Sequence, residues 1–262
     1  MSYSSKHFLI RCYHSLRELS TRRKKGRFNK QQTPTENVNM RHRITEMEAG
    51  LWSLGVFAIV TILVFSGRLQ AIDAQSGLLV NGYDLGGLGT TLMQLITSYG
   101  RELVWGLLVL IMFLFGNQNT KILALELGVL FLFGALVGDL SKILLPRPRP
   151  FPTIPVTLRV PNETDSSYPS GHALIVSIGA AFCLASFHRR ILAGLLTFEA
   201  GIVCYSRVYL GVHYPLDVAG GVLLGIAIAL VGTSLLKKYV QPHLTRTAEA
   251  TGRILGKGYV DL

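Results

Sequence analysis

Residues 217–236 read DVAGGVLLGIAIALVGTSLL, and Asp217 is the only charged residue among these twenty. An α-helix rises about 1.5 Å per residue, so a helix of this length matches a hydrocarbon core of about 30 Å. Apolar residues follow one another here without the alternation typical of a half-buried strand. The stretch therefore predicts a helix that crosses a membrane.

Five further apolar runs precede it, at 50–66, 103–115, 122–145, 171–187 and 191–209. Hydrophobic residues make up 49% of the chain and charged residues only 16%, which leaves too little polar surface for six helices in a soluble fold. A closed β-barrel would need alternating segments of about ten residues, which these runs lack. We therefore predict an all-α integral membrane bundle of six transmembrane helices over residues 47–238.

The net charge of +11 lies in the two ends of the chain. Residues 1–46 carry eleven Lys or Arg against three Glu, whereas residues 47–236 are neutral. A nucleic-acid-binding domain would carry its positive charge on the folded part, so we expect no nucleic-acid partner. Apolar residues within 8–19 indicate an amphipathic helix on anionic lipid, an unstructured cytoplasmic tail or a transit peptide. Residues 237–262 carry the remaining net charge of +3, and we expect residues 239–262 to form a cytoplasmic C-terminal tail.

Lys and Arg near the span ends predict the orientation, because they favour the cytoplasmic side. The basic tail precedes the first span, Arg189 and Arg190 lie between the fourth and fifth spans, and Lys237 and Lys238 follow the sixth. We expect a multi-pass protein of the plasma membrane with both termini in the cytoplasm. The outward connections are then 67–102, 146–170 and 210–216.

The three cysteines, Cys12, Cys183 and Cys204, are an odd number and have no C-x-x-C spacing. Two of them lie within apolar runs. The sequence therefore predicts neither a disulfide framework nor a zinc site.

Cations gather where the third span ends. Residues 142–150 read KILLPRPRP, which puts Lys142 on the last helical turn. The prolines keep the residues before them extended, so Arg147 and Arg149 are presented on a stiff segment.

The start of the fourth span has the composition of an anion site. Residues 168–172 read YPSGH, and Ser170 is a favourable N-cap for a helix that Gly171 opens. The free N–H groups of such a helix start favour phosphate binding, and His172 lies beside them.

The third segment joins the fifth and sixth spans and reads SRVYLGVHYPLD from residue 206 to 217. Pro215 suits the first helical position, which places Asp217 in the first turn, able to reach back to His213. A histidine held by a carboxylate through one nitrogen has a fixed tautomer and a more nucleophilic second nitrogen. Together with Arg207 and the cations above, this set suits phosphoryl transfer.

These segments match the pattern K-x6-R-P, P-S-G-H and S-R-x5-H-x3-D, so the chain resembles the type 2 phosphatidic acid phosphatases over about residues 50–236. That family is related to bacterial acid phosphatases and vanadium haloperoxidases. The resemblance implies that His213 attacks phosphorus to form a phosphohistidine, Asp217 holds its ring and His172 protonates the leaving oxygen. It implies a phosphate cradle made by Lys142, Arg149, Ser170, Gly171 and Arg207. It implies no cofactor and no metal.

A site at the membrane surface favours a lipid phosphate or pyrophosphate as substrate, with the tail left in the bilayer. Family precedent favours a polyprenyl diphosphate, and phosphatidic acid or phosphatidylglycerol phosphate is the alternative. A sugar-phosphate phosphatase or phosphotransferase would use the same chemistry. A catalytically silent lipid-phosphate binder or a transporter is an alternative of a different class.

Polar residues outside the motifs have less definite interpretations. We expect Arg147 to make a secondary phosphate or interface contact, and Arg159 to face solvent. Tyr168 and Tyr214 suit aromatic anchors at the membrane interface. We expect Asp139 to pair with Lys142 or Arg207, and Glu199 to be a protonated carboxyl hydrogen-bonded between helices. Residues 67–102 indicate one or two short interfacial helices with a flexible break at the glycines 86, 87 and 89, or else a loop packed on the bundle.

Overall fold

The computed structural model describes residues 34–239. The tail predictions for residues 1–33 and 240–262 lie outside these residues. The chain divides after Arg43 into two compact units, and all the packing described below belongs to the second, which begins at Ile44. Residues 34–43 form the first turns of a helix.

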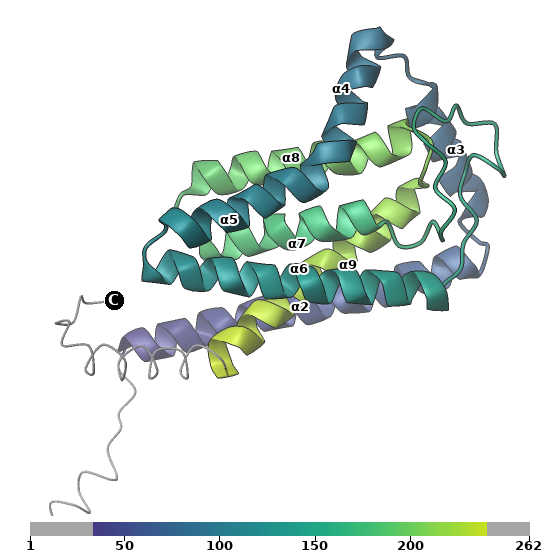
Figure 1. The fold of residues 1–262 in the computed structure, drawn as a ribbon. Coiled ribbons are helices and arrows are strands. Elements are labelled where there is room, and N and C mark those ends of the chain that lie inside the picture. The colour runs from purple at the N-terminus through teal and green to yellow at the C-terminus, as the bar shows by residue number, and fades with distance from the viewer. Residues whose placement is uncertain (1–33, 240–262) are drawn as a thin grey trace, which may run out of the picture. The chain divides into compact units, whose positions relative to one another are not determined.

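Regular structure within residues 34–239 is helical, as predicted. In chain order the helices are α2 (Pro34–Phe65), α3 (Gln70–Gly82), α4 (Gly86–Tyr99), the π-helical turn η1 (Gly100–Val104), α5 (Trp105–Phe115), α6 (Gln118–Leu144), α7 (Gly171–Ser186), α8 (Arg190–Tyr209) and α9 (Pro215–Tyr239). Figure 1 shows α5 to α8 running side by side, with the long loop between α6 and α7 at one end of the bundle.

Within residues 34–239, five helical segments are long and apolar enough to cross a membrane, so the protein is a multi-pass integral membrane protein. They are Ile44–Phe65, Gly86–Phe115, Gln118–Leu144, Arg190–Tyr209 and Pro215–Tyr239. The predicted fourth span, residues 171–187, corresponds to α7, which has only 16 residues and is not among these five. The six-span count is therefore not confirmed.

The second span begins earlier than the sequence suggested. We predicted a loop to residue 102 and a span from 103, but α4, η1 and α5 follow one another from Gly86 to Phe115. Apolar residues of α4 extend the membrane segment, and the π turn at Gly100 joins the two helices. Of the one or two short helices expected in 67–102, the structure has α3 and α4, but α4 belongs to the candidate span and not to an interfacial segment. The break lies at residues 83–85, and Gly86 begins α4 with a positive φ of 68°, which glycine adopts readily.

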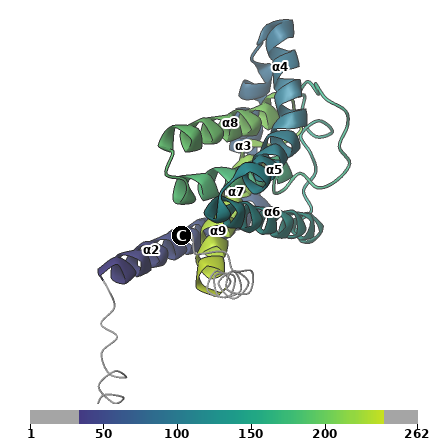
Figure 2. The ribbon, with the colours of Figure 1, turned by 60° about the vertical axis from the view of Figure 1, so that its left-hand side comes forward.

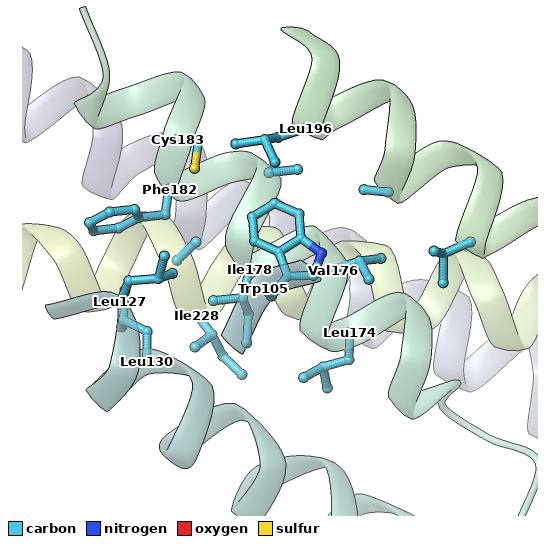
Figure 3. Close-up of a cluster of buried hydrophobic side chains, with 14 of the residues drawn as sticks. Trp105, Leu127, Leu130, Leu174, Val176, Ile178, Phe182, Cys183, Leu196 and Ile228 are labelled. Atoms are coloured by element: carbon cyan, nitrogen blue, oxygen red, sulfur yellow. The ribbon is translucent and has the colours of Figure 1, made fainter. Parts of the chain in front are cut away.

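Helix α7 forms the centre of the bundle and packs against α8, α9 and α6. Its apolar side chains meet Trp105, Leu127 and Ile228 in the buried cluster of Figure 3. Gly179 lies directly under Trp105, and a Cβ there would come within 2.1 Å of the indole. In contrast, the outer helices expose large apolar side chains such as Ile62, Leu132 and Ile191, as expected of surfaces that face lipid.

Two glycines bring α9 against the start of α7. A Cβ at Gly221 would lie 2.5 Å from the carbonyl oxygen of Ser170, and one at Gly225 would lie 2.5 Å from that of Leu174. The absence of side chains thus permits backbone contact between these helices. This contact holds the N-terminus of α7 beside the first turns of α9.

Candidate active site

His213 lies in the tight connection between α8 and α9. Gly211 has a positive φ of 81°, and the N–H groups of Val212 and His213 both donate to the carbonyl oxygen of Arg207. These contacts turn the imidazole inward, where it is only 2% exposed. The burial lowers the pKa of His213 to about 4; Asp217 opposes this shift and Arg207 adds to it.

The two ring nitrogens of His213 have different neighbours. Nδ1 lies 3.6 Å from Oδ2 of Asp217 and 3.4 Å from Oγ of Ser167. Nε2 lies 3.4 Å from a guanidinium nitrogen of Arg149. The carboxylate side and the cation side of the ring are therefore separate, and Nε2 is the nitrogen that faces the cations.

Asp217 is completely buried and has four neighbours that fix it. Its Oδ2 accepts from the N–H of Tyr214 at 2.8 Å and from the hydroxyl of Ser167. Its Oδ1 accepts from Arg147 at 2.5 Å. The predicted approach of Asp217 to His213 is present, at 3.6 Å.

Arg147 is shared between two buried carboxylates. One terminal nitrogen contacts Asp217, and the other contacts Asp73 of α3 at 2.6 Å. Asp73 also accepts from the N–H of Leu216 at 2.9 Å. Burial acts to lower the pKa of Arg147, but the two carboxylates outweigh it and raise the pKa above its usual value. Arg147 thus braces the carboxylate beside His213, in place of the phosphate or interface contact that we expected.

The three cations of the predicted cradle converge on two carboxylates of the loop between α6 and α7. Glu163 bridges Arg207 and Arg149, at 2.7 Å from the latter. Asp165 bridges Arg149, at 2.5 Å, and Lys142. Burial would raise the pKa values of both acids, but these cations lower them, to about 2 for Asp165.

The start of α7 completes the group. Ser170 caps the helix by accepting from the N–H of Ala173 at 3.5 Å, and its own N–H donates to the carbonyl oxygen of Asp217. A Cβ on Gly171 would lie 3.8 Å from Nζ of Lys142, so this ammonium group is next to the helix start. His172 follows, with Nδ1 at 3.4 Å from a guanidinium nitrogen of Arg101.

A cavity of about 760 Å³ leads from this end of the molecule along α5, α6 and α7. Its polar end contains Lys142, Gly171 and Arg101. Its remaining length is mostly apolar, with Leu132 and Ile175 among the lining residues. The shape and polarity suit a ligand with an anionic head and a hydrocarbon tail.

The structure brings together all eight predicted site residues: Lys142, Arg149, Ser170, Gly171, His172, Arg207, His213 and Asp217. Sequence reasoning missed five polar neighbours, which are Asp73, Arg101, Glu163, Asp165 and Ser167. Arg101 and Asp73 could have been proposed as site residues, because each is a charged residue next to an apolar run. Glu163, Asp165 and Ser167 lie in an irregular loop, where spacing indicates no contact.

Several other expectations were wrong. Asp139 is exposed, and the carboxylates that pair with Lys142 and Arg207 are those of the loop instead. Tyr168 and Tyr214 are buried, with hydroxyls bonded to Thr61 and Thr153. Arg159 is half-buried because it donates to the carbonyl oxygen of Tyr209 and stacks over that ring.

The interhelical hydrogen bond expected of Glu199 is present, since Trp105 donates to it at 3.2 Å across α5 and α8. Among the described residues, no group of three or more His, Cys, Asp or Glu side chains is placed to hold a metal ion. Figure 2 shows the bundle from a second side, with the loop that supplies Glu163 and Asp165 again at one end.

A membrane bundle with this site defines a class of integral membrane phosphatases. Residues 123–241 match the model of the PAP2 superfamily. The chain is 39% identical to the undecaprenyl-diphosphatase of Sulfolobus acidocaldarius over 157 residues, which cover 57% of this chain and 74% of that protein. The chain therefore belongs to the PAP2 superfamily of membrane lipid phosphatases.

Two further relatives and one solved structure extend this result. The undecaprenyl-diphosphatase BcrC of Bacillus subtilis is 31% identical, over 54% of this chain and 72% of that protein. The sphingosine-1-phosphate phosphatase 1 of Rattus norvegicus is 29% identical, over 51% of this chain and 33% of that protein. The fold is similar to a transmembrane PAP2-type phosphatidylglycerolphosphate phosphatase from Bacillus subtilis, with a TM-score of 0.60 at 22% identity, over 73% of this chain and 98% of that one.

Proposed function

We propose that this phosphatase removes the terminal phosphate of a polyprenyl diphosphate through a phosphohistidine on His213. The observation that carries the proposal is the position of His213, with Nδ1 beside Asp217 and Nε2 facing Arg149. The named activity of the two diphosphatase relatives, at 39% and 31% identity, favours this lipid class.

The first chemical step is attack by Nε2 of His213 on the terminal phosphorus. The bond from phosphorus to the bridging oxygen breaks, and its electron pair leaves with the lipid monophosphate. Asp217 stabilises the positive charge that develops on the ring as Nε2 forms its bond. Ser167 and Arg147 keep that carboxylate in place, so they are positioning residues.

His172 lies at the start of α7, within electrostatic range of His213, Arg207 and Lys142. This position suits a general acid that donates a proton to the leaving oxygen. Water then attacks the phosphohistidine and releases orthophosphate, with His172 acting as the base. The net reaction consumes one water and yields a lipid monophosphate and phosphate.

The phosphate group takes the place of the loop carboxylates. Lys142, Arg149 and Arg207 bind oxygens of Glu163 and Asp165, and a phosphoryl group offers oxygens of the same charge to the same donors. The N–H groups at Gly171 add donors for a further oxygen. Because these cations neutralise the transferred group, we expect the reaction to need no metal ion or cofactor.

The orientation that we propose puts this site at the outer face of the membrane, with both termini in the cytoplasm. Arg189, Arg190, Lys237 and Lys238 lie at the opposite ends of their helices from the site, which supports this orientation. We propose that α7 also crosses the membrane, as the fourth of six spans, inside a membrane domain of residues 47–238 that is flanked by the tails 1–46 and 239–262. Its short length is compatible with this role because protein surrounds it.

Phosphate release in detergent tests the assignment. The substrates are a polyprenyl diphosphate, phosphatidic acid, phosphatidylglycerol phosphate and glucose 6-phosphate, each with and without EDTA. We expect the diphosphate to be preferred and EDTA to have no effect. His213→Ala should abolish turnover and the acid-labile phosphoenzyme. Loss of activity in EDTA with recovery in magnesium, or normal turnover by His213→Ala, would contradict the mechanism.

A lipid monophosphate is the second candidate substrate. The similarity to sphingosine-1-phosphate phosphatase 1 favours it, because that relative's name states a monophosphate lipid. The cradle around His213 accepts a terminal phosphate in either case. A higher kcat/KM for phosphatidic acid than for the diphosphate would support this alternative.

A further inference from the structure

Arg101 is a cation near the site that none of the three motifs contains. It lies in the π turn η1, and its guanidinium group is 3.4 Å from Nδ1 of His172. Its side chain is 31% exposed and forms an ion pair with its neighbour Glu102, which is 70% exposed. A pair this exposed contributes little stability, so Arg101 is free to bind an anion at small cost.

The position of Arg101 is fixed by its helix. A Cβ at Gly100 would lie 2.7 Å from both Glu199 and Val203, so η1 packs directly on α8. π turns within helices occur frequently at functional sites. The charge of Arg101 acts on His172 and on Arg207, which places it on the edge of the phosphate cradle.

The other cations near His213 are already engaged. Arg147 is held by two buried carboxylates, and Lys142, Arg149 and Arg207 form the cradle around Glu163 and Asp165. Among the residues that the structure describes, Arg101 contacts Glu102 and His172, which belong to neither network. It lies instead where the cradle opens into the 760 Å³ cavity, together with Lys142 and Gly171.

We propose that Arg101 binds the phosphate that remains on the lipid, and so selects diphosphates over monophosphates. The inference rests on the proposed function. With the terminal phosphate on the cradle and the tail in the apolar cavity, the second phosphate of a diphosphate lies at the junction between them. Arg101 is the guanidinium group at that junction.

The chemistry of the leaving group gives Arg101 a part in the reaction. When the bond to the bridging oxygen breaks, negative charge grows on the lipid monophosphate that departs. A guanidinium group can bind two of its oxygens while His172 protonates the bridging oxygen. A monophosphate substrate releases an alcohol, which has no charged oxygens for Arg101 to bind.

The test compares two lipids with the same polyprenyl tail, one a diphosphate and one a monophosphate. A charge-assisted contact of about 1.5–3 kcal/mol corresponds to about 10- to 100-fold in rate. We expect Arg101→Ala to lower kcat/KM for the diphosphate by that factor, and for the monophosphate less than about 3-fold. Arg101→Lys should recover part of the loss. Arg68→Ala, which removes an exposed arginine near the same end, is the matched control.

A competition assay tests the same subsite without a lipid. With an aryl phosphate as reporter, inorganic pyrophosphate should inhibit wild type more strongly than orthophosphate, and Arg101→Ala should remove the difference. If Arg101→Ala lowered kcat/KM equally for both lipids, Arg101 would act through His172. If it lowered kcat/KM for neither lipid, Arg101 would have no part in the reaction. Either result overturns the subsite. Failure of wild type to hydrolyse any polyprenyl substrate would instead contradict the proposed function, while the competition assay would still decide the role of Arg101.

Discussion

Asp217 accepts hydrogen bonds from Ser167, Arg147 and the N–H of Tyr214, and it lies 3.6 Å from Nδ1 of His213. Replacing it by Asn keeps the size but removes the charge that stabilises the ring. We expect Asp217→Asn to lower kcat by about 10²-fold or more, as in other His–carboxylate pairs. Phosphate release measures the effect, and Asp84→Asn in an exposed turn is the control. Retention of more than half of the wild-type kcat would remove Asp217 from the mechanism.

The burial of His213 has a consequence for the pH dependence. The attacking ring must be neutral, and burial lowers its pKa to about 4, whereas an exposed histidine has a pKa of about 6.5. A lowered pKa keeps the ring neutral in more acidic solution. The fall of kcat/KM on the acidic side of the pH profile, where His213 becomes protonated, should therefore lie near pH 4. The profile is measured after the ionisation of the substrate phosphate has been determined by NMR. A fall of kcat/KM near pH 6.5 that is not due to ionisation of the substrate would show that the ring is more hydrated than its position implies.

Helix α3 affects the site through Asp73, which holds Arg147 against Asp217. Removing a buried partner leaves uncompensated charge, at a cost of about 3–5 kcal/mol. Arg147→Met should therefore lower the melting temperature in detergent markedly. Arg147→Lys should lower it less, because a lysine keeps the positive charge although it lacks the fork that reaches both acids. Arg159→Met removes a half-buried arginine that has no buried carboxylate, so it should shift the melting temperature little. Equal shifts for both Met variants would contradict this role of α3.

We expect the loop between α6 and α7 to compete with phosphate for the cradle. Glu163 and Asp165 carry negative charge at neutral pH, because adjacent cations lower their pKa values. The double variant Glu163→Gln and Asp165→Asn should bind orthovanadate about 3- to 10-fold more tightly, because less charge must be displaced. Inhibition curves measure this, with Thr164→Ala in the same loop as control. Unchanged or weaker vanadate binding would show that the carboxylates do not compete.

The contacts around His213 and the cradle show which site residues could be predicted from the sequence and which could not. His172, His213, Asp217 and the motif cations were predictable because fixed spacing on helix ends carries their chemistry. Arg147 was recognised as a presented cation but was given the wrong partner, because Asp73 is far from it in sequence. The loop acids follow no helical or strand period, so only the folded chain brings them to the cations.

For the whole molecule, the apolar runs predicted the all-α fold class, whereas their count of six spans is not confirmed. Long exposed helices such as α2 and α6 can be recognised from their long apolar runs. Helix α7 is short because other helices surround it and lipid need not cover it. The start of the second span was misplaced because α4 has glycines and threonines among its leucines.

The orientation of the whole bundle is testable by labelling. In a background without native cysteines, Thr164→Cys should react with a membrane-impermeant thiol reagent in intact cells. Asn119→Cys, equally exposed at the other end, should react only after lysis. The reverse pattern would place the site in the cytoplasm.

The glycine contact between α7 and α9 restricts substitution in one part of the bundle more than in another. At Gly221 and Gly225 even a methyl group would strike backbone, so the half of the protein that carries the histidines tolerates almost no variation there. Two of the cavity glycines on α6, Gly128 and Gly138, have ordinary clearances of 3.9 and 3.6 Å for a Cβ, so an alanine fits there. A Cβ at Gly134, the third, would lie 2.3 Å from Ile178. We therefore expect substitutions at Gly128 or Gly138 to change which hydrocarbon tail is accepted, while the backbone contact beside the histidines stays unchanged.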